Sequence, residues 1–143
     1  REIVATALSK RFEVDPSGAI IKFEQFCPWK EHLFDLEKEL GITEATGNRP
    51  LYVLYEDTSR RWRVQAIPVE PDSFASRLPL PESWRGFRDE ELSGKSGIAD
   101  CVFVHHSGFI GGNKTLDGAL SMARQSLALS NSEEAQMKRQ RVE

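Results

Sequence analysis

The 143-residue sequence has only two cysteines, no long apolar run and no excess of positive charge. Cys27 and Cys101 are too few for a disulfide framework and are not spaced as metal ligands, so we expect two free thiols in a reducing compartment. No apolar run reaches the length of a transmembrane helix, and no signal peptide is recognisable. The formal net charge is −3, which argues against a chain that is basic throughout. Any site for an anion must therefore be a local patch.

The length and the composition are those of one globular domain. Residues 1–12 carry apolar side chains at helical spacing from the first position, so we expect the end of a helix that arrives from a missing upstream segment. Residues 130–143 are polar and charged, and we expect disorder or a frayed helix there. Residues 13–129 are predicted to form the domain itself.

Turn residues and apolar patterns predict the elements within this domain. Trp29, Leu33, Leu36 and Leu40 form one apolar stripe of a helix, with Pro28 in its first turn and Gly41 as its C-cap. The predicted elements, in order, are a turn at 15–18, a strand at 20–23, this helix, a hairpin of strands 51–55 and 62–67, a long loop at 70–98 with a short helical stretch near 88–92, a strand at 101–105 and a helix from about 115. We expect an α/β (α+β) fold, with a mixed, mostly antiparallel sheet flanked by helices.

The segment "CVFVHHSGFIGGNKT", residues 101–115, allows two interpretations. In the first, a strand feeds a glycine-rich loop and a helix, whose free N–H groups and positive dipole end form an anion site. The residues of that site are His105, Ser107, Gly108, Gly111, Gly112 and Lys114. In the second, the glycines only permit a tight turn, Thr115 caps the helix without a ligand, His105 is a hydrogen-bonded core residue and His106 lies on the surface. The segment alone does not decide between them.

The same segment comes close to a P-loop, because "GFIGGNKT" matches G-x-x-x-x-G-K-[ST] except for Asn113 before the lysine. No apolar strand that ends in an acidic metal ligand stands out elsewhere in the sequence. A nucleoside triphosphatase (NTPase) is therefore a distant alternative function for the chain.

The arginines also allow two interpretations. Arg77 and Arg85 flank Trp84 in the proline-rich loop, where arginine can form a fork on phosphate and tryptophan can stack on a base. Alternatively, Trp84 fills the core. Arg61 and Arg63 share one face of a predicted strand, which is usually a solvated face.

Several long strings make the chain similar to one known family. "VDPSG", "CPWKEHL", "RWRVQAIPVEPDSFASRLPLPESWRG", "RDEELS" and "FVHHSGFIGGNKTLDGALSMAR" occur in order from about Arg11 to Leu127. They resemble the C-terminal part of the melanocyte-proliferating-gene (Myg) family, which belongs to the DHH phosphoesterase superfamily. The resemblance implies a metal-dependent hydrolase that acts as a 3′–5′ RNA exonuclease of mitochondrion and nucleus.

The resemblance also implies that metal binding and substrate binding are carried out by different domains. The family keeps its metal-binding aspartates and histidines in an N-terminal domain, so residues 1–12 would be the end of a helix that links to it. A divalent metal, Mn²⁺ or Mg²⁺, would bind there, no metal would bind here, and this chain alone would be inactive. In related proteins a Gly-Gly-His loop contacts substrate phosphate. Gly111 and Gly112 match its glycines, and Asn113 stands where the histidine is expected.

The expected partners are then single-stranded RNA and the chain's own N-terminal catalytic domain, without a membrane. The N–H groups of residues 111–113 and Lys114 would hold phosphate, Arg77 and Arg85 would add charge, and Trp84 or Phe109 would offer a stacking surface. The competing hypothesis is a non-catalytic structural or interaction module with a purely structural glycine loop. Convergence of Arg77, Arg85 and Lys114 on one surface would favour substrate binding.

Overall fold

The computed structural model describes the backbone of residues 2–24 and 27–142, and the side chains as far as residue 130 apart from that of Glu44. Its main feature is a five-stranded sheet with the strand order β1-β2-β3-β5-β4, in which β1 is parallel to β2 and the other pairs are antiparallel. This confirms the predicted α/β fold with a mixed, mostly antiparallel sheet. The elements are α1 (Glu2–Ser9), α2 (Arg11–Val14), β1 (Ile20–Lys22), α3 (Lys30–Leu40), the short 3-10 helix η1 (Glu44–Thr46), β2 (Tyr52–Glu56), β3 (Trp62–Ala66), the 3-10 helix η2 (Glu82–Trp84), α4 (Asp89–Ser96), β4 (Cys101–Val104), β5 (Ile110–Asn113) and α5 (Leu116–Val142).

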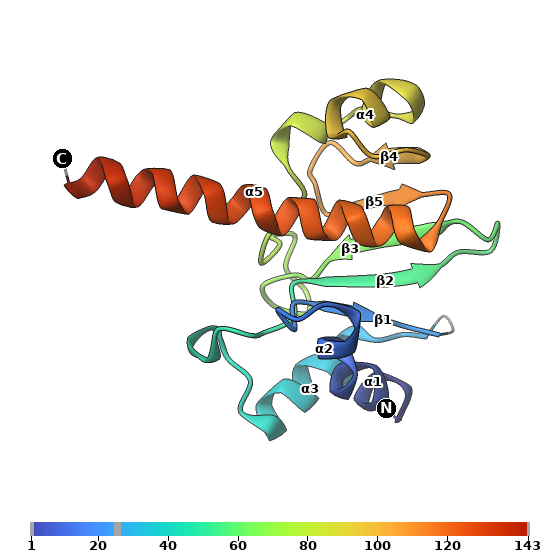
Figure 1. Ribbon diagram of the computed structural model, residues 1–143. Helices are drawn as coiled ribbons and strands as arrows, with labels where there is room; N and C mark the ends of the chain where they lie inside the picture. The colour runs from blue at the N-terminus through green and yellow to red at the C-terminus, as the bar shows by residue number, and fades with distance from the viewer. Residues whose placement is uncertain (1, 25–26, 143) are drawn as a thin grey trace.

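The helices cover the two faces of the sheet unequally. Figure 1 shows α1, α2 and α3 gathered at the β1 edge, α4 at the β4 edge, and α5 running across the sheet. The main core lies between the sheet and α5, where Tyr52, Leu54 and Val64 meet Met122. A second core lies between α1, α3 and the strands β1 and β2.

Strand alternation sends successive side chains to these two cores. In β2, Tyr52 and Leu54 face α5, whereas Val53 belongs to the second core. In β3, which is paired with β2 residue by residue, Arg63 and Gln65 therefore lie on the face away from α5. Both residues are only partly buried, so this half of the second face is partly exposed.

Local sequence signals set several boundaries correctly. The turn at residues 15–18 forms, with the Ser17 hydroxyl 2.5 Å from the Asp15 carboxylate and Gly18 at a φ of 72°. Gly41 ends α3 with a left-handed φ of 69°. The helix begins at Lys30, so Pro28 lies before it, and Leu40 is 63% exposed rather than part of the buried stripe.

The two ends of the chain are helical. The predicted N-terminal helix is divided at Lys10 into α1 and α2. The backbone of α5 stays helical to Val142, past residue 130, where the sequence predicted disorder or a frayed helix. Among the described residues, none of the helices combines the length and apolar character needed to cross a bilayer.

Candidate functional site

The predicted glycine loop is mostly a strand. The tight turn spans His105–Gly108, where the Gly108 N–H donates to the His105 carbonyl, and residues 110–113 then form β5 between β3 and β4. The loop prediction was wrong there, because three of the four residues of "IGGN" are glycine or asparagine, which are depleted in strands. The backbone of β5 faces neighbouring strands on both sides rather than an open loop.

Close packing explains the two glycines of β5. A Cβ atom on Gly111 would lie 3.0 Å from the Phe103 carbonyl oxygen and 3.0 Å from a methyl group of Leu80. On Gly112 it would lie 3.3 Å from the ring of Phe103. The glycines therefore let side chains and backbone approach the strand. Their role toward phosphate stays a prediction.

The start of α5 is capped by the chain itself. The Thr115 hydroxyl accepts the Gly118 N–H at 2.9 Å, as predicted for an N-cap. The side chain of Asn113 is buried, donates to the Ala99 carbonyl at 2.8 Å and accepts the Thr115 N–H at 3.0 Å. These bonds give Asn113 a structural role at the position where the superfamily resemblance expects histidine.

The cationic residues predicted to join this segment lie apart. Both terminal nitrogens of Arg77 donate to the carboxylate of Glu37, at 2.6 and 2.8 Å, and only 4% of the Arg77 side chain is exposed. Arg85 donates to the Leu80 carbonyl at 2.9 Å beside Gly108, at the opposite end of β5 from Lys114. Arg77, Arg85 and Lys114 therefore do not converge on one surface, and this is the outcome that favours the structural interpretation of the glycine segment.

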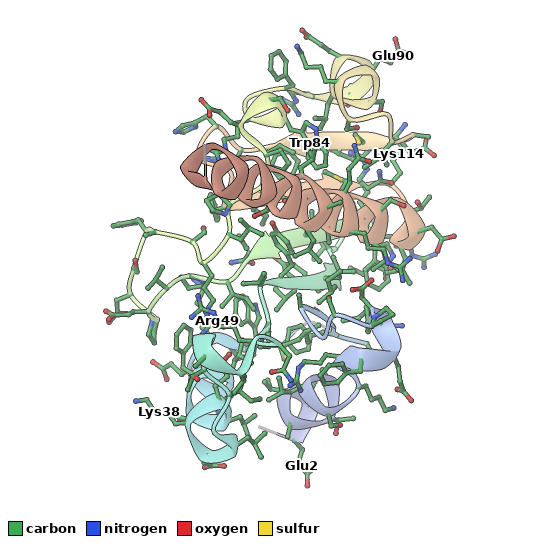
Figure 2. All side chains as sticks on the ribbon, turned by 60° about the vertical axis from the view of Figure 1, so that its left-hand side comes forward. Glu2, Lys38, Arg49, Trp84, Glu90 and Lys114 are labelled. Atoms are coloured by element: carbon green, nitrogen blue, oxygen red, sulfur yellow. The ribbon has the colours of Figure 1, made fainter. Side chains whose placement is uncertain are left out.

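The aromatic and histidine residues predicted to bind the substrate make contacts within the chain. Trp84 is 1% exposed in the main core, so it fills the core rather than offering a stacking surface. Figure 2 shows Trp84 and the exposed Lys114 in the part of the molecule that carries α5. His105 bonds the Ser107 hydroxyl at 2.8 Å, and its ring lies against His106 and Phe109, with centroids 4.2 and 4.8 Å apart.

A different group of residues forms a charged concavity on the open half of the sheet. We call this 410 Å³ concavity the arginine hollow. Its lining residues are Asp57, Ser59, Arg61, Trp62, Arg63, Gly86, Phe87, Arg88, Val102, Phe103, Val104 and Gly112. Three arginines face one aspartate here, a formal excess of two positive charges in a chain whose net charge is −3. Gly112 is the one residue of the sequence-predicted site that lines it.

The sheet register builds the hollow. Gly112 pairs with Arg63 on one side and with Phe103 on the other. Because Gly112 has no side chain, the Phe103 ring can lie against it, and the Arg63 guanidinium carbon lies 5.0 Å from the centre of that ring. Arg88 forms an isolated backbone bridge with Phe103 and is exposed, as is Arg61.

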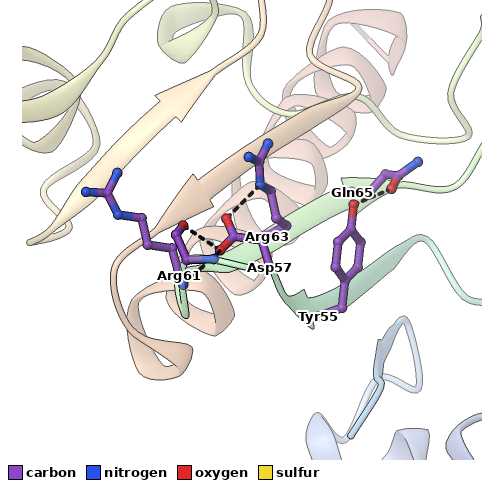
Figure 3. Close-up of polar contacts among 6 residues, drawn as sticks. Tyr55, Asp57, Arg61, Arg63 and Gln65 are labelled. Carbon is purple, nitrogen blue, oxygen red and sulfur yellow. Dashed lines mark hydrogen bonds and ion pairs between the residues drawn. The ribbon is translucent and has the colours of Figure 1, made fainter. Parts of the chain in front are cut away.

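Asp57 fixes the position of Arg63. One carboxylate oxygen of Asp57 accepts the Arg63 Nε–H at 3.2 Å, and the other accepts the backbone N–H groups of Ser59 and Arg61 at 2.8 and 3.1 Å. Figure 3 shows this arrangement, with the terminal nitrogens of Arg63 directed away from Asp57. Burial raises the pKa of Asp57, but hydrogen bonds from Ser59, Arg61 and Arg63 outweigh burial and lower the pKa to about 2. The carboxylate is therefore ionised at neutral pH.

This chemistry suits an anion that carries an aromatic group. Arginine binds phosphate through two parallel N–H bonds, and aromatic rings stack on bases. Within the part of the chain that the structure describes, no three His, Cys, Asp or Glu side chains come together as metal ligands. The sequence alone does not reveal this site, although the alternation of Arg61, Trp62 and Arg63 predicts that both arginines lie on one face.

Comparison with known proteins gives the family. The model of the family described as "Uncharacterised protein family (UPF0160)", MYG1 exonuclease, matches residues 1–127. The chain is 58% identical over 129 residues to "MYG1 exonuclease" of Bos taurus and 55% identical over 129 residues to that of Homo sapiens. It is 48% identical over 128 residues to "MYG1 protein YER156C" of Saccharomyces cerevisiae.

These alignments cover 90% of this chain but only 33% of the two mammalian proteins and 37% of the yeast protein. The chain thus spans about a third of the length of these relatives. No solved structure matches it. Because the family match extends over residues 1–127, the chain belongs to the MYG1 exonuclease family.

Proposed function

We propose that this chain is the substrate-binding part of a metal-dependent phosphodiesterase that acts as a 3′–5′ RNA exonuclease. Two mammalian relatives carry the name exonuclease, and this chain matches a third of their length. In the proposal, the chain is C-terminal to a DHH-type catalytic domain, which binds Mn²⁺ or Mg²⁺ and supplies the activated water. The whole protein acts in mitochondrion and nucleus, and this chain alone is inactive.

The arginine hollow is the observation that carries the proposal. It concentrates positive charge next to aromatic rings in a chain that is acidic as a whole. Arg61, Arg63 and Arg88 hold the phosphates of a single-stranded RNA, and the ring of Phe103 supports the stacked Arg63. Asp57 holds Arg63 through Nε, which leaves the terminal nitrogens for a phosphate.

Binding to a fluorescently labelled single-stranded RNA tests this function. The double variant Arg61→Ala/Arg88→Ala removes two exposed side chains, so its fold should be unchanged. We expect its affinity to fall at least ten-fold and its salt dependence to weaken, by about 0.7 in the logarithmic slope for each phosphate that the protein no longer neutralises. Lys114→Ala is the matched control, and its affinity should stay within two-fold of wild type.

The assignment to the hollow fails if Lys114→Ala weakens binding and the double arginine variant does not, because the phosphate site would then be at the start of α5. The proposed division of labour is tested by adding Mn²⁺ to this chain alone with a labelled RNA. Robust degradation would contradict it.

A non-catalytic structural or interaction module is the second candidate function. The separation of Arg77, Arg85 and Lys114 and the strand geometry of Gly111 and Gly112 favour it. Absence of RNA binding at low salt, both by this chain and by the whole polypeptide that contains it, would establish this alternative over substrate binding.

A further inference from the structure

The arginine hollow continues into two further concavities on the open face of the sheet. A second concavity of 400 Å³ is lined by Tyr55, Glu56, Asp57, Thr58 and Arg63. It shares Asp57 and Arg63 with the arginine hollow. A third, of 410 Å³, is lined by residues 27–32 with Tyr55 and Gln65, and it shares Tyr55 with the second. Together they form one continuous surface, which we call the track.

The strand register explains why the track is continuous. Tyr55 of β2 pairs with Arg63 of β3, and Arg63 pairs with Gly112 of β5, which pairs with Phe103 of β4. These four positions face away from α5, so they form one row across four strands. Figure 3 shows Tyr55 and Gln65 beside Arg63 and Asp57, and the Tyr55 hydroxyl donates to Gln65 at 3.0 Å.

The row is longer than one nucleotide. Neighbouring strands are about 4.8 Å apart, so four strands extend over about 14 Å. Sheets that bind single-stranded RNA use aromatic side chains on such a face to stack two or three bases. Here the aromatic side chains are Phe103 and Tyr55, at the two ends of the row.

The positive charge of the track is concentrated at its arginine end. Arg61, Arg63 and Arg88 line that end, whereas at the other end the charge of Lys30 is balanced by that of Glu31. Of the two acidic residues that line the middle, Asp57 is already bound to Arg63, and Glu56 is exposed and belongs to the strand position that faces α5.

We propose that the track binds a single-stranded RNA of several nucleotides, with phosphates at the arginine hollow and a following base on Tyr55. This inference rests on the proposed function and extends it, because it assigns a second subsite beyond the hollow. A ligand of two nucleotides occupies the arginine hollow alone, whereas one of six nucleotides also reaches Tyr55 and the start of α3.

The test compares a dinucleotide with a hexanucleotide on the whole polypeptide that contains this chain, with the 143-residue chain in parallel. The variants are Tyr55→Ala, Tyr55→Phe and Arg61→Ala/Arg88→Ala. Phe74→Ala and Lys38→Ala are matched controls, because Phe74 is fully exposed and neither residue lines the track. Figure 2 shows Lys38 on α3.

We expect Tyr55→Ala to weaken hexanucleotide binding about ten-fold, as for loss of one stacked base, and to leave dinucleotide binding unchanged. Tyr55→Phe keeps the ring and should bind as wild type. The double arginine variant should weaken binding of both ligands. The control variants should change neither.

Three outcomes would contradict the proposal that the track binds RNA. If only the double arginine variant weakens hexanucleotide binding, the hollow and the proposed function stand but the track does not. If Tyr55→Ala weakens both ligands equally in a folded protein, Tyr55 belongs to a single site. If neither Tyr55→Ala nor the double arginine variant weakens the binding of either oligonucleotide, both proposals fail.

Should Tyr55→Ala not fold, cross-linking keeps the proposal falsifiable. A hexanucleotide that carries one 4-thiouridine is irradiated on the wild-type protein, and the cross-linked peptides are identified by mass spectrometry. Cross-links to the peptides that hold Tyr55 and Phe103 are expected. Cross-links confined to the region of Lys114 would overturn the track.

Discussion

The two halves of the sheet differ in how their second face is used. Over β1 and the first part of β2, the face away from α5 is closed by α1 and α3, and Val53 and Leu33 are fully buried there. Over β3, β5 and β4, the same face carries Arg63, Gln65 and Phe103, which are partly exposed. In the closed half, Arg77 and Glu37 form a buried ion pair, whereas in the open half Arg61, Arg63 and Arg88 line the surface of a hollow. The comparison separates charges that stabilise the fold from charges that are available to a ligand.

The largest expected effect is in the closed half. Glu37 is 5% exposed and binds both terminal nitrogens of Arg77, so Glu37→Ala leaves an uncompensated cation in the interior. We expect the free energy of unfolding to fall by about 3–5 kcal/mol, measured by urea denaturation. Asp35→Ala, an exposed position on the same helix, should cost less than about 0.5 kcal/mol. A loss for Glu37→Ala as small as this would show that the pair does not stabilise the closed half.

Substitution of the two adjacent glycines of β5 by alanine should have an intermediate effect on stability. Because Gly111 and Gly112 lie on opposite faces of the sheet, the two variants compare these faces directly. Gly111 faces α5, and an added Cβ meets a backbone oxygen that has no freedom to move, so Gly111→Ala should cost about 1–3 kcal/mol. Gly112 lines the hollow, and an added Cβ would lie 3.3 Å from the ring of Phe103 and 3.4 Å from the Trp62 carbonyl oxygen, which is less close than the contacts at Gly111. Gly112→Ala should cost less than Gly111→Ala but, if the proposed function holds, weaken RNA binding by displacing the ring of Phe103. Equal destabilisation by the two variants would contradict the difference between the faces.

The smallest expected effect concerns Asp57 in the open half. Its folded-state pKa of about 2 lies below the ordinary value of 3.8, so its stabilising contribution is present above about pH 4. That contribution is lost as the pH falls from 4 to 2. After allowance for solvent screening it is about 1 kcal/mol.

Thermal unfolding between pH 2 and 5 measures this contribution. Asp57→Asn should be less stable than wild type at pH 5 and equal to it near pH 2. Asp72→Asn, at an exposed loop position, is the matched control and should follow the wild-type curve. A constant difference between Asp57→Asn and wild type across the range would show that ionisation of Asp57 is not involved.

The fold could be predicted further than the site. Turn chemistry and apolar periods predicted the hairpin of β2 and β3, the C-cap Gly41 and the N-cap Thr115, because these features depend on neighbouring residues. The partner of Arg77 is 40 positions away at Glu37, and no local pattern indicates such a pair. The strand β5 was missed because packing by Leu80 and Phe103, rather than β propensity, determines it.

The arginine hollow was missed for a related reason. Arg61 precedes β3, Arg63 belongs to β3 and Arg88 precedes α4, and these segments meet through β4 and β5. Alternation placed Arg61 and Arg63 on one face, but the sequence did not reveal which half of that face the helices leave uncovered.

The pairing of β3 with β5 has a consequence for the kinetics of folding. The hairpins β2–β3 and β4–β5 are local in sequence, whereas Trp62 pairs with Asn113 and Gln65 with Ile110. Joining the hairpins closes a loop of more than forty residues, which is entropically costly and slow relative to hairpin formation. Arg63 meets Gly112 and Phe103 only after this step. The arginine hollow thus assembles late, and the RNA binding proposed for it would report that the two hairpins have docked.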